Sequence, residues 1–146
     1  AGRRMSALAS KGLKVVQGVG AAPSRAMDKL QSASASRASR SMSAKLYRVG
    51  LERYKSGRYA EAEELFRAAL RINEREMEPF SEELAVNMNN LAATLERQDK
   101  LSEALSLCAR AHAIFAQTHG KDHPRTQHVA SKLKEIEAAL KCAPGG

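Results

Sequence analysis

The sequence predicts an all-α fold, a short solenoid of stacked helical hairpins preceded by a basic, extended N-terminal arm. Residues 50–72 and 92–114 align without gaps at an offset of 42, and self-similarity of this length indicates stacked supersecondary units. Apolar residues in both segments recur every three or four positions, which is the period of an amphipathic helix. Aromatic residues make up only 4% of the 146 residues, a composition that favours helices interlocked through Ala and Leu over a β-sandwich.

The first third of the chain carries the whole net charge of +8. Residues 1–45 contain nine Lys or Arg against a single acid, whereas the remaining residues hold 15 basic and 15 acidic side chains. A basic segment of this kind is suited to an anionic partner. The residues predicted to contact such a partner are Arg3, Arg4, Lys11, Lys14, Arg37 and Arg40.

Residues 1–43 are predicted to form this arm, with one or two short amphipathic helices. A helix over residues 3–16 would gather its apolar side chains on one side and its basic side chains on the other. A second helix over residues 24–31 would be capped by Ser24. Between residues 32 and 43, six of twelve positions are Ser and three are Ala. Such a stretch buries little apolar surface, so it is predicted to be a linker that is ordered only where a partner holds it.

Three interpretations of the arm remain open. An Arg- and Ser-rich, acid-poor, amphipathic N-terminus is typical of an organellar transit peptide, which would indicate a mitochondrial protein; the alternative location is cytoplasmic. The same composition suits a basic arm that lies on anionic lipid headgroups or on RNA phosphates. RNA is the weaker of these two partners, because the arm has no aromatic side chain to stack on bases. The third interpretation is a solvated tail.

A repeat domain is predicted for residues 44–142. Its helices are expected at 44–56, 60–76, 81–97, 101–118 and 125–141, followed by a flexible tail at 143–146. Gly57 ends the first of these helices, as glycine commonly does just past a helix C-terminus. Pro79 with Ser81 marks the start of the third helix, and Gly120 with Pro124 precedes the fifth.

Small residues are predicted at the points where paired helices cross. Gly50 and its repeat counterpart Ala92 have side chains small enough for two helix axes to approach closely. Phe66 fills the space beside the first crossing. Its counterpart Cys108 is smaller, so we expect looser packing and lower stability in the second unit.

These repeats resemble the tetratricopeptide repeat, in the longer form found in kinesin light chains and related adaptors. The resemblance depends on the 42-residue period, the run NNLAATLERQDKLSEA at 89–104 and the sequence HGKDHP at 119–124. It covers about 95 residues and implies two repeats plus a capping helix. Asp99 stands where the family has a turn glycine, Arg53 stands where an aromatic residue or Leu is common, and the heptad coiled coil of kinesin light chains is absent.

The sequence HGKDHP has the appearance of a metal site, because His119 and His123 have the i, i+4 spacing of zinc ligands on a helix. Gly120 and Pro124 prevent a helix from running through them. In the family that the chain resembles, this segment is the turn between repeats, in which Gly120 reverses the chain, Asp122 caps the next helix and Pro124 starts it. A turn is therefore predicted.

No enzyme chemistry is predicted. The sequence contains no Ser/His/Asp set, no glycine-rich phosphate loop and no paired acids in an expected cleft. Cys108 and Cys142 have neither the number nor the spacing of a disulfide framework or a zinc site. Catalytic residues, metals, cofactors and a small-molecule substrate are all expected to be absent.

The inner face of such a solenoid is lined by the first helix of each hairpin. The residues predicted to bind protein there are Tyr47, Arg48, Leu51, Tyr54, Asn89, Asn90 and Lys132. An Asn amide offers both a donor and an acceptor, so Asn89 and Asn90 are suited to hold the backbone of an extended peptide. The alternative is that these Asn side chains are solvated or cap local structure.

Two functional hypotheses follow. In the first, the chain is a noncatalytic structural subunit of a large organellar complex, such as a respiratory complex, ATP synthase or ribosome. Solenoids usually need about three repeats, so a short array is expected to be supported by other subunits. In the second, it is a free cytosolic adaptor that binds peptides, as kinesin light chains do. No apolar run approaches the length of a transmembrane segment.

Overall fold

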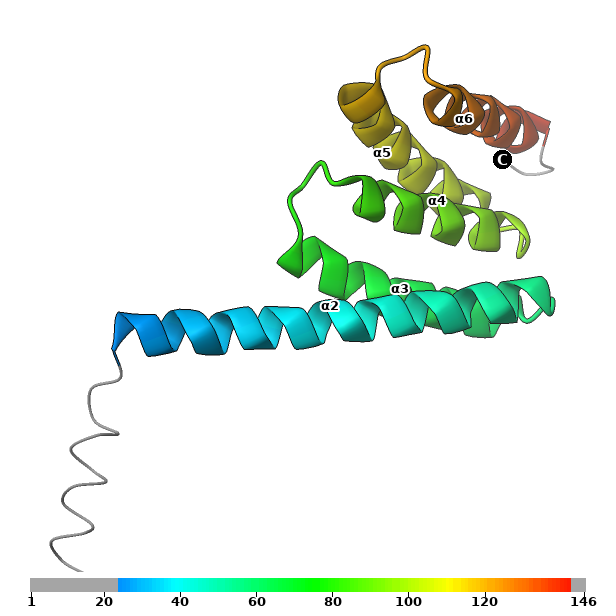
Figure 1. Ribbon diagram of the computed structural model, residues 1–146. Coiled ribbons are helices and arrows are strands. Elements are labelled where there is room, and N and C mark those ends of the chain that lie inside the picture. The colour runs from blue at the N-terminus through cyan, green and yellow to red at the C-terminus, as the bar shows by residue number, and fades with distance from the viewer. Residues whose placement is uncertain (1–23, 143–146) are drawn as a thin grey trace, which may run out of the picture. The chain divides into compact units, whose positions relative to one another are not determined.

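The computed structural model describes residues 24–142 of the chain. In this range the chain forms α2 (Arg25–Lys55), α3 (Tyr59–Glu76), α4 (Glu82–Glu96), α5 (Leu101–His119) and α6 (Pro124–Cys142), and no strand (Figure 1). The all-α prediction is confirmed. The predictions for residues 1–23 and 143–146, including those for Arg3, Arg4, Lys11 and Lys14, lie outside the described residues.

The predicted linker over residues 32–43 is wrong, because these residues belong to α2. The segment has no Gly or Pro, Ala is the strongest helix former, and Ser costs only about 0.5 kcal/mol per residue relative to Ala. Ser24 starts the helix as predicted, since its Oγ accepts a hydrogen bond from the Met27 amide at 3.3 Å. Most side chains of this segment are exposed, as the linker prediction expected. Its backbone is nevertheless helical, because Ala and Ser have sufficient helix propensity.

Two compact units divide the chain, and the boundary after Arg37 falls within α2. In the described part of the first unit, residues 24–37, every side chain except the half-buried Ser36 is exposed. Met27 and Leu30 are 52% and 69% exposed. This part of the helix therefore depends on propensity and its cap.

From Ala38 onward, α2 packs against α3 at a close crossing. A Cβ atom on Gly50 would lie 2.8 Å from the ring of Phe66, which explains the small residue predicted there. The rings of Tyr47 and Phe66 have centroids 5.7 Å apart. Nearer the C-terminal end of α3, the buried Ser43 donates a hydrogen bond to Asn73 Oδ1.

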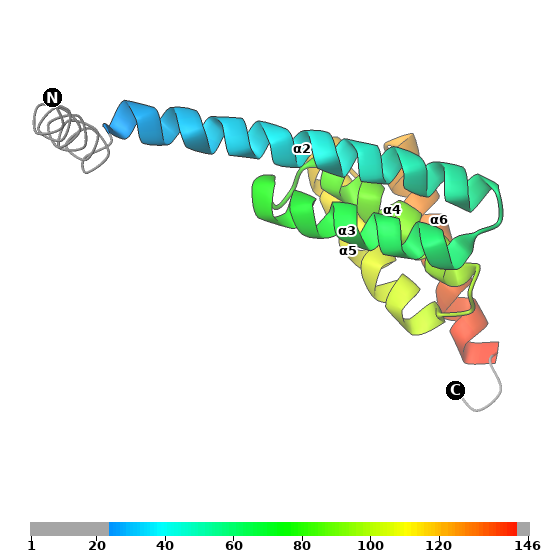
Figure 2. The same ribbon diagram turned by 90° about the horizontal axis from the view of Figure 1, so that it is seen from below.

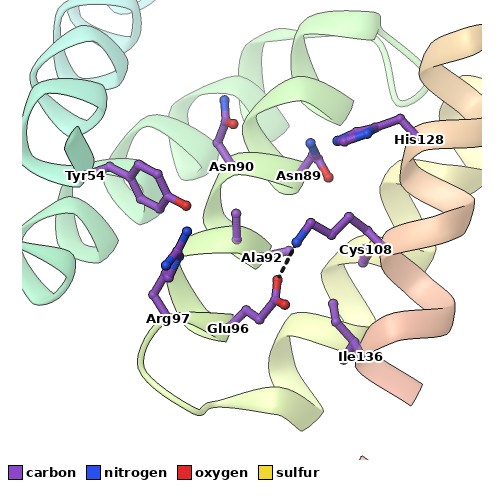
Figure 3. A pocket seen from close by; sticks show the side chains of 11 residues that line it. Tyr54, Asn89, Asn90, Ala92, Glu96, Arg97, Cys108, His128 and Ile136 are labelled. Carbon is purple, nitrogen blue, oxygen red and sulfur yellow. Dashed lines mark hydrogen bonds and ion pairs between the residues drawn. The ribbon is translucent and has the colours of Figure 1, made fainter. Parts of the chain in front are cut away.

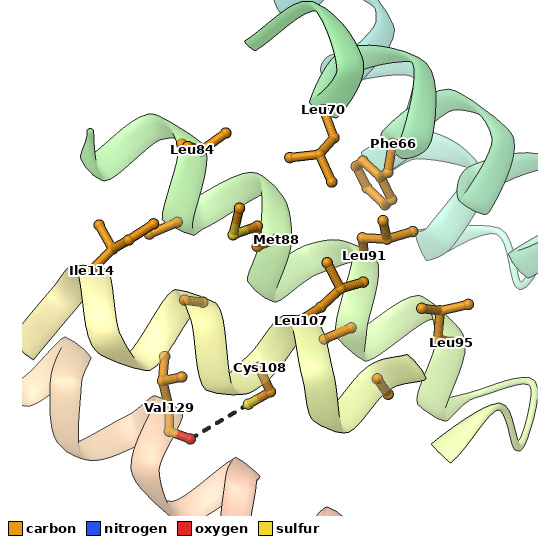
Figure 4. Close-up of a cluster of buried hydrophobic side chains, with 14 of the residues drawn as sticks. Phe66, Leu70, Leu84, Met88, Leu91, Leu95, Leu107, Cys108, Ile114 and Val129 are labelled. Carbon is orange, nitrogen blue, oxygen red and sulfur yellow. Dashed lines mark hydrogen bonds between the residues drawn. The ribbon is translucent and has the colours of Figure 1, made fainter. Parts of the chain in front are cut away.

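A single hydrophobic cluster continues from α3 to α6, and consecutive helices from α3 onward pack side by side (Figures 1 and 2). In Figure 4, Phe66 and Leu70 of α3 face Leu91 of α4, and Leu107 and Ile114 belong to α5.

In the second repeat, Cys108 is buried although it is smaller than its counterpart Phe66. The Cys108 side chain is 1% exposed, and its thiol lies 3.6 Å from the Val129 carbonyl of α6. Burial raises the pKa of the Cys108 thiol to about 11.

Left-handed residues form the predicted turns. Gly57 and Gly120 have φ values of 77° and 88°, and Asp99 has a φ of 62° at the position where the family has glycine. The fifth predicted helix starts at Pro124, as expected. The expected cap by Asp122 is wrong: the Arg125 amide donates to Nδ1 of His123 at 3.2 Å.

None of the helices between residues 24 and 142 is long and apolar enough to cross a membrane.

Candidate functional site: the inner groove

Helices α2, α4 and α6 line a groove, which we call the inner groove. It consists of two adjoining hollows of about 420 and 460 Å³ that share Asn89, Asn90 and His128. Tyr54, Ala93, Glu96, Arg97 and Lys132 also line the first hollow, and Tyr47, Val86 and Phe115 also line the second. The first helix of each predicted hairpin thus contributes to one surface.

Five of the seven predicted residues line the inner groove; these are Tyr47, Tyr54, Asn89, Asn90 and Lys132. The other two do not. Leu51 is half-buried against the hydrophobic cluster, and the exposed Arg48 lines neither hollow. Neighbouring positions on a helix point about 100° apart, so residues close in sequence divide between groove, core and solvent.

The two adjacent Asn residues have different roles. Asn90 Nδ2 donates a hydrogen bond of 2.6 Å to the hydroxyl of Tyr47, which ties α4 to α2. Burial raises the pKa of Tyr47, and this hydrogen bond offsets only part of the rise. Asn89 is half-buried and has no hydrogen-bond partner for its side chain among the described residues. The whole amide of Asn89 is therefore available to a ligand in the groove, whereas Asn90 has one of its N–H groups engaged by Tyr47.

Lys132 of α6 places a positive charge at the inner groove. Lys132 Nζ lies 3.3 Å from a Glu96 carboxylate oxygen, and a dashed line marks this pair at Glu96 in Figure 3. Lys132 Nζ also lies 3.6 Å from Glu135. Burial lowers the pKa of Lys132, but the hydrogen bonds and charges of Glu96 and Glu135 together outweigh it and raise the pKa. Arg97 lines the same hollow and forms no ion pair with a carboxylate among residues 24–142. Because Lys132 already lies close to two carboxylates, Arg97 is the cation that favours an acceptor-rich or acidic ligand group.

Sequence reasoning missed Glu96, Arg97 and His128. A signal for them was present, because His128 precedes Lys132 by four residues, and Glu96 and Arg97 follow Asn89 and Asn90 by seven. Extending the helical period of the predicted residues by one or two turns would have included them.

The histidines of the HGKDHP turn belong to helix packing. The His119 and His123 rings stack with centroids 4.5 Å apart, and His119 Nε2 lies 3.2 Å from a Glu82 carboxylate oxygen. Glu82 also pairs with Arg125. Residues 24–142 contain no group of three or more His, Cys, Asp or Glu side chains placed to hold a metal.

Comparison with known proteins identifies the repeats. The tetratricopeptide repeat family matches residues 41–107 and again residues 87–141. A 53-residue stretch is 40% identical to RxLR effector protein SFI4 of Phytophthora infestans (strain T30-4), which corresponds to 36% of this chain and 16% of that protein. The chain thus spans about a sixth of the length of this relative. Because the family match extends over most of the chain, this chain belongs to the tetratricopeptide repeat family of protein-interaction scaffolds.

Proposed function

We propose that the inner groove binds an extended segment of a partner protein and that the chain acts without catalysis. The observation that carries this proposal is the amide of Asn89, which has no hydrogen-bond partner between residues 24 and 142 and lies in a groove that Lys132 and Arg97 also line. An extended segment offers both a carbonyl and an amide hydrogen to one Asn side chain. An acidic side chain of the segment would pair with Lys132 or Arg97.

The wider role that we propose is that of a small structural subunit in a mitochondrial assembly. The basic first third and the exposed apolar side chains of α2 support it, since Met27, Leu30 and Met42 are 52%, 69% and 53% exposed. Arg37 and Arg40 are exposed three residues apart on one helix face. On this proposal they face other subunits, anionic lipid headgroups or RNA.

The test is a pull-down of the tagged protein from its own cells in mild detergent, followed by mass spectrometry and sizing. We expect near-stoichiometric recovery in one large assembly. The double variant Asn89→Ala/Lys132→Ala should lose the partner, whereas Arg48→Ala, an exposed change outside the groove, should retain it. Equal recovery with both variants would refute the groove as the binding surface.

A second candidate is a free cytoplasmic adaptor of the kinesin-light-chain type, favoured by the 42-residue period and the HGKDHP turn. The same pull-down separates the two roles. A small soluble pool with varied, substoichiometric partners would favour the adaptor and contradict the subunit.

A further inference from the structure

A third hollow opens between α2, the end of α3 and the start of α4, and we call it the α3–α4 recess. Its volume is about 760 Å³, larger than either hollow of the inner groove. The residues that line it are Arg40, Ser43, Ala44, Tyr47, Asn73, Met77, Ser81, Glu82, Glu83 and Val86. This volume is within the range of ordinary ligand sites.

The recess adjoins one hollow of the inner groove, with which it shares Tyr47 and Val86, and its other lining residues are different. The Tyr47 hydroxyl is held by Asn90, which fixes the ring in place. Asn89 and Lys132 do not line the recess.

A buried amide lies at the recess with an unused donor. Asn73 is 6% exposed, and its Oδ1 accepts a hydrogen bond from Ser43. The structure gives Asn73 Nδ2 no acceptor among residues 24–142, yet this atom is not among the fully enclosed ones. A largely buried donor that is open to a hollow is suited to an acceptor on a ligand.

The walls of the recess differ in charge. On the α4 wall, Glu82 is paired with Arg125, whereas Glu83 is exposed and has no ion-pair partner within the described range. The apolar part of the lining consists of Ala44 on α2, Met77 after α3 and Val86 on α4. Met77 and Val86 are both half-buried, so their exposed apolar surface would gain from contact with a ligand.

We propose that the α3–α4 recess binds a peptide segment of a partner protein that presents one large apolar side chain next to Arg or Lys. The apolar side chain packs between Ala44, Met77 and Val86. A backbone carbonyl of the segment accepts the unused hydrogen bond of Asn73, and the basic side chain pairs with Glu83. Arg40 on the α2 wall gives the site its direction, because it repels a basic side chain placed on that side.

The test uses short fluorescein-labelled peptides, blocked at both ends, in which a Leu-Arg pair is set among Gly and Ser. Fluorescence anisotropy is measured with the full chain. Leu-Arg peptides should bind at least about tenfold more tightly than Leu-Glu or Ser-Arg peptides, a difference of about 1.4 kcal/mol. Equal affinity for the three peptides would overturn the proposal, as would no saturable binding up to about 1 mM.

Variants locate the binding. Ala44→Trp fills the recess from an exposed position and should weaken Leu-Arg binding by at least about tenfold. Glu83→Lys should reverse the preference towards Leu-Glu. Ala113→Trp on α5, an equally exposed change, and Asn89→Ala in the inner groove should leave the affinity unchanged. Loss of binding in Asn89→Ala with normal binding in Ala44→Trp would assign the peptide to the inner groove and refute the recess.

Discussion

At the scale of single residues, Glu63 is the centre of an ion-pair network. Its carboxylate accepts hydrogen bonds from Arg67 on its own helix, at 2.8 and 2.9 Å, and from Gln98 and Lys100 in the α4–α5 turn, at 2.8 and 2.9 Å. Arg67 continues the network to Glu103 of α5 at 2.6 Å. Burial raises the pKa of Glu63, but these hydrogen bonds outweigh it and lower the pKa to about 2.

This pKa makes stability depend on acid. Because the folded pKa lies below the unfolded value of 4.5, the ionised Glu63 stabilises the fold above pH 4.5, and this contribution is lost as the pH falls towards 2. The loss should be about 1 to 3 kcal/mol. We expect Glu63→Gln to have a flatter dependence of unfolding free energy on pH in urea titrations between pH 7 and 2. The control Glu64→Gln, on an exposed side chain, should keep the wild-type slope; identical slopes for all three proteins would contradict the prediction.

Gly50 is the second residue with a measurable effect. Ala is a better helix former than Gly by about 0.5–1 kcal/mol, but its Cβ would overlap the fully buried ring of Phe66, and overpacking costs about 1–3 kcal/mol. Gly50→Ala should therefore destabilise the protein by about 1 kcal/mol in urea unfolding. In a Phe66→Leu background, the same change should cost nothing or stabilise, because the ring is gone. If Gly50→Ala were more stable than the wild type, the Phe66 ring would have moved to make room for the methyl group, and the prediction would be wrong.

At the scale of the elements, the start of α6 tests the corrected cap. Since His123 Nδ1 accepts from the Arg125 amide, His123→Ala should lose about 0.5–2 kcal/mol, whereas His123→Asn should recover most of it, because Asn is a good N-cap. Asp122→Ala, on an exposed side chain, should change the unfolding free energy by less than about 0.5 kcal/mol. If Asp122→Ala lowered the unfolding free energy more than His123→Ala, Asp122 would be the capping residue and the assignment to His123 would be wrong.

The elements also show what sequence could predict. Gly57, Pro79 and Gly120 act through the local backbone, so the boundaries of α3 to α6 were predicted to within a few residues. The length of α2 was not, because the linker interpretation weighed burial and left out the helix propensity of Ala.

The inner groove, too, could be predicted from the sequence only in part. Helical period placed Asn89 and Asn90 on the inner face. That Asn90 is engaged by Tyr47 depends on a contact between residues 43 positions apart, which no local pattern reveals. Likewise, the α3–α4 recess joins Asn73 near the end of α3 to residues of α2 and α4.

At the scale of the whole molecule, the hydrophobic cluster is continuous from α3 to α6. It predicts that the whole repeat domain unfolds in one step. The chain's three Tyr residues all lie in α2 and α3, so their near-ultraviolet circular dichroism reports on the first hairpin. Labelling of the enclosed Cys108 thiol reports on α5. We expect both signals to change at the same urea concentration. Labelling of Cys108 at a lower concentration would instead support the looser second unit that its smaller side chain suggested.

The stacking of α3 to α6 in chain order has a consequence for how fast the protein folds. Each of these helices packs on its neighbours in sequence, so few contacts require distant parts of the chain to find one another. Chains rich in local contacts fold in microseconds to milliseconds, whereas β-sandwiches require milliseconds to seconds. Ribosomal synthesis adds about 5–20 residues per second. Each hairpin can therefore form well before the next one is complete.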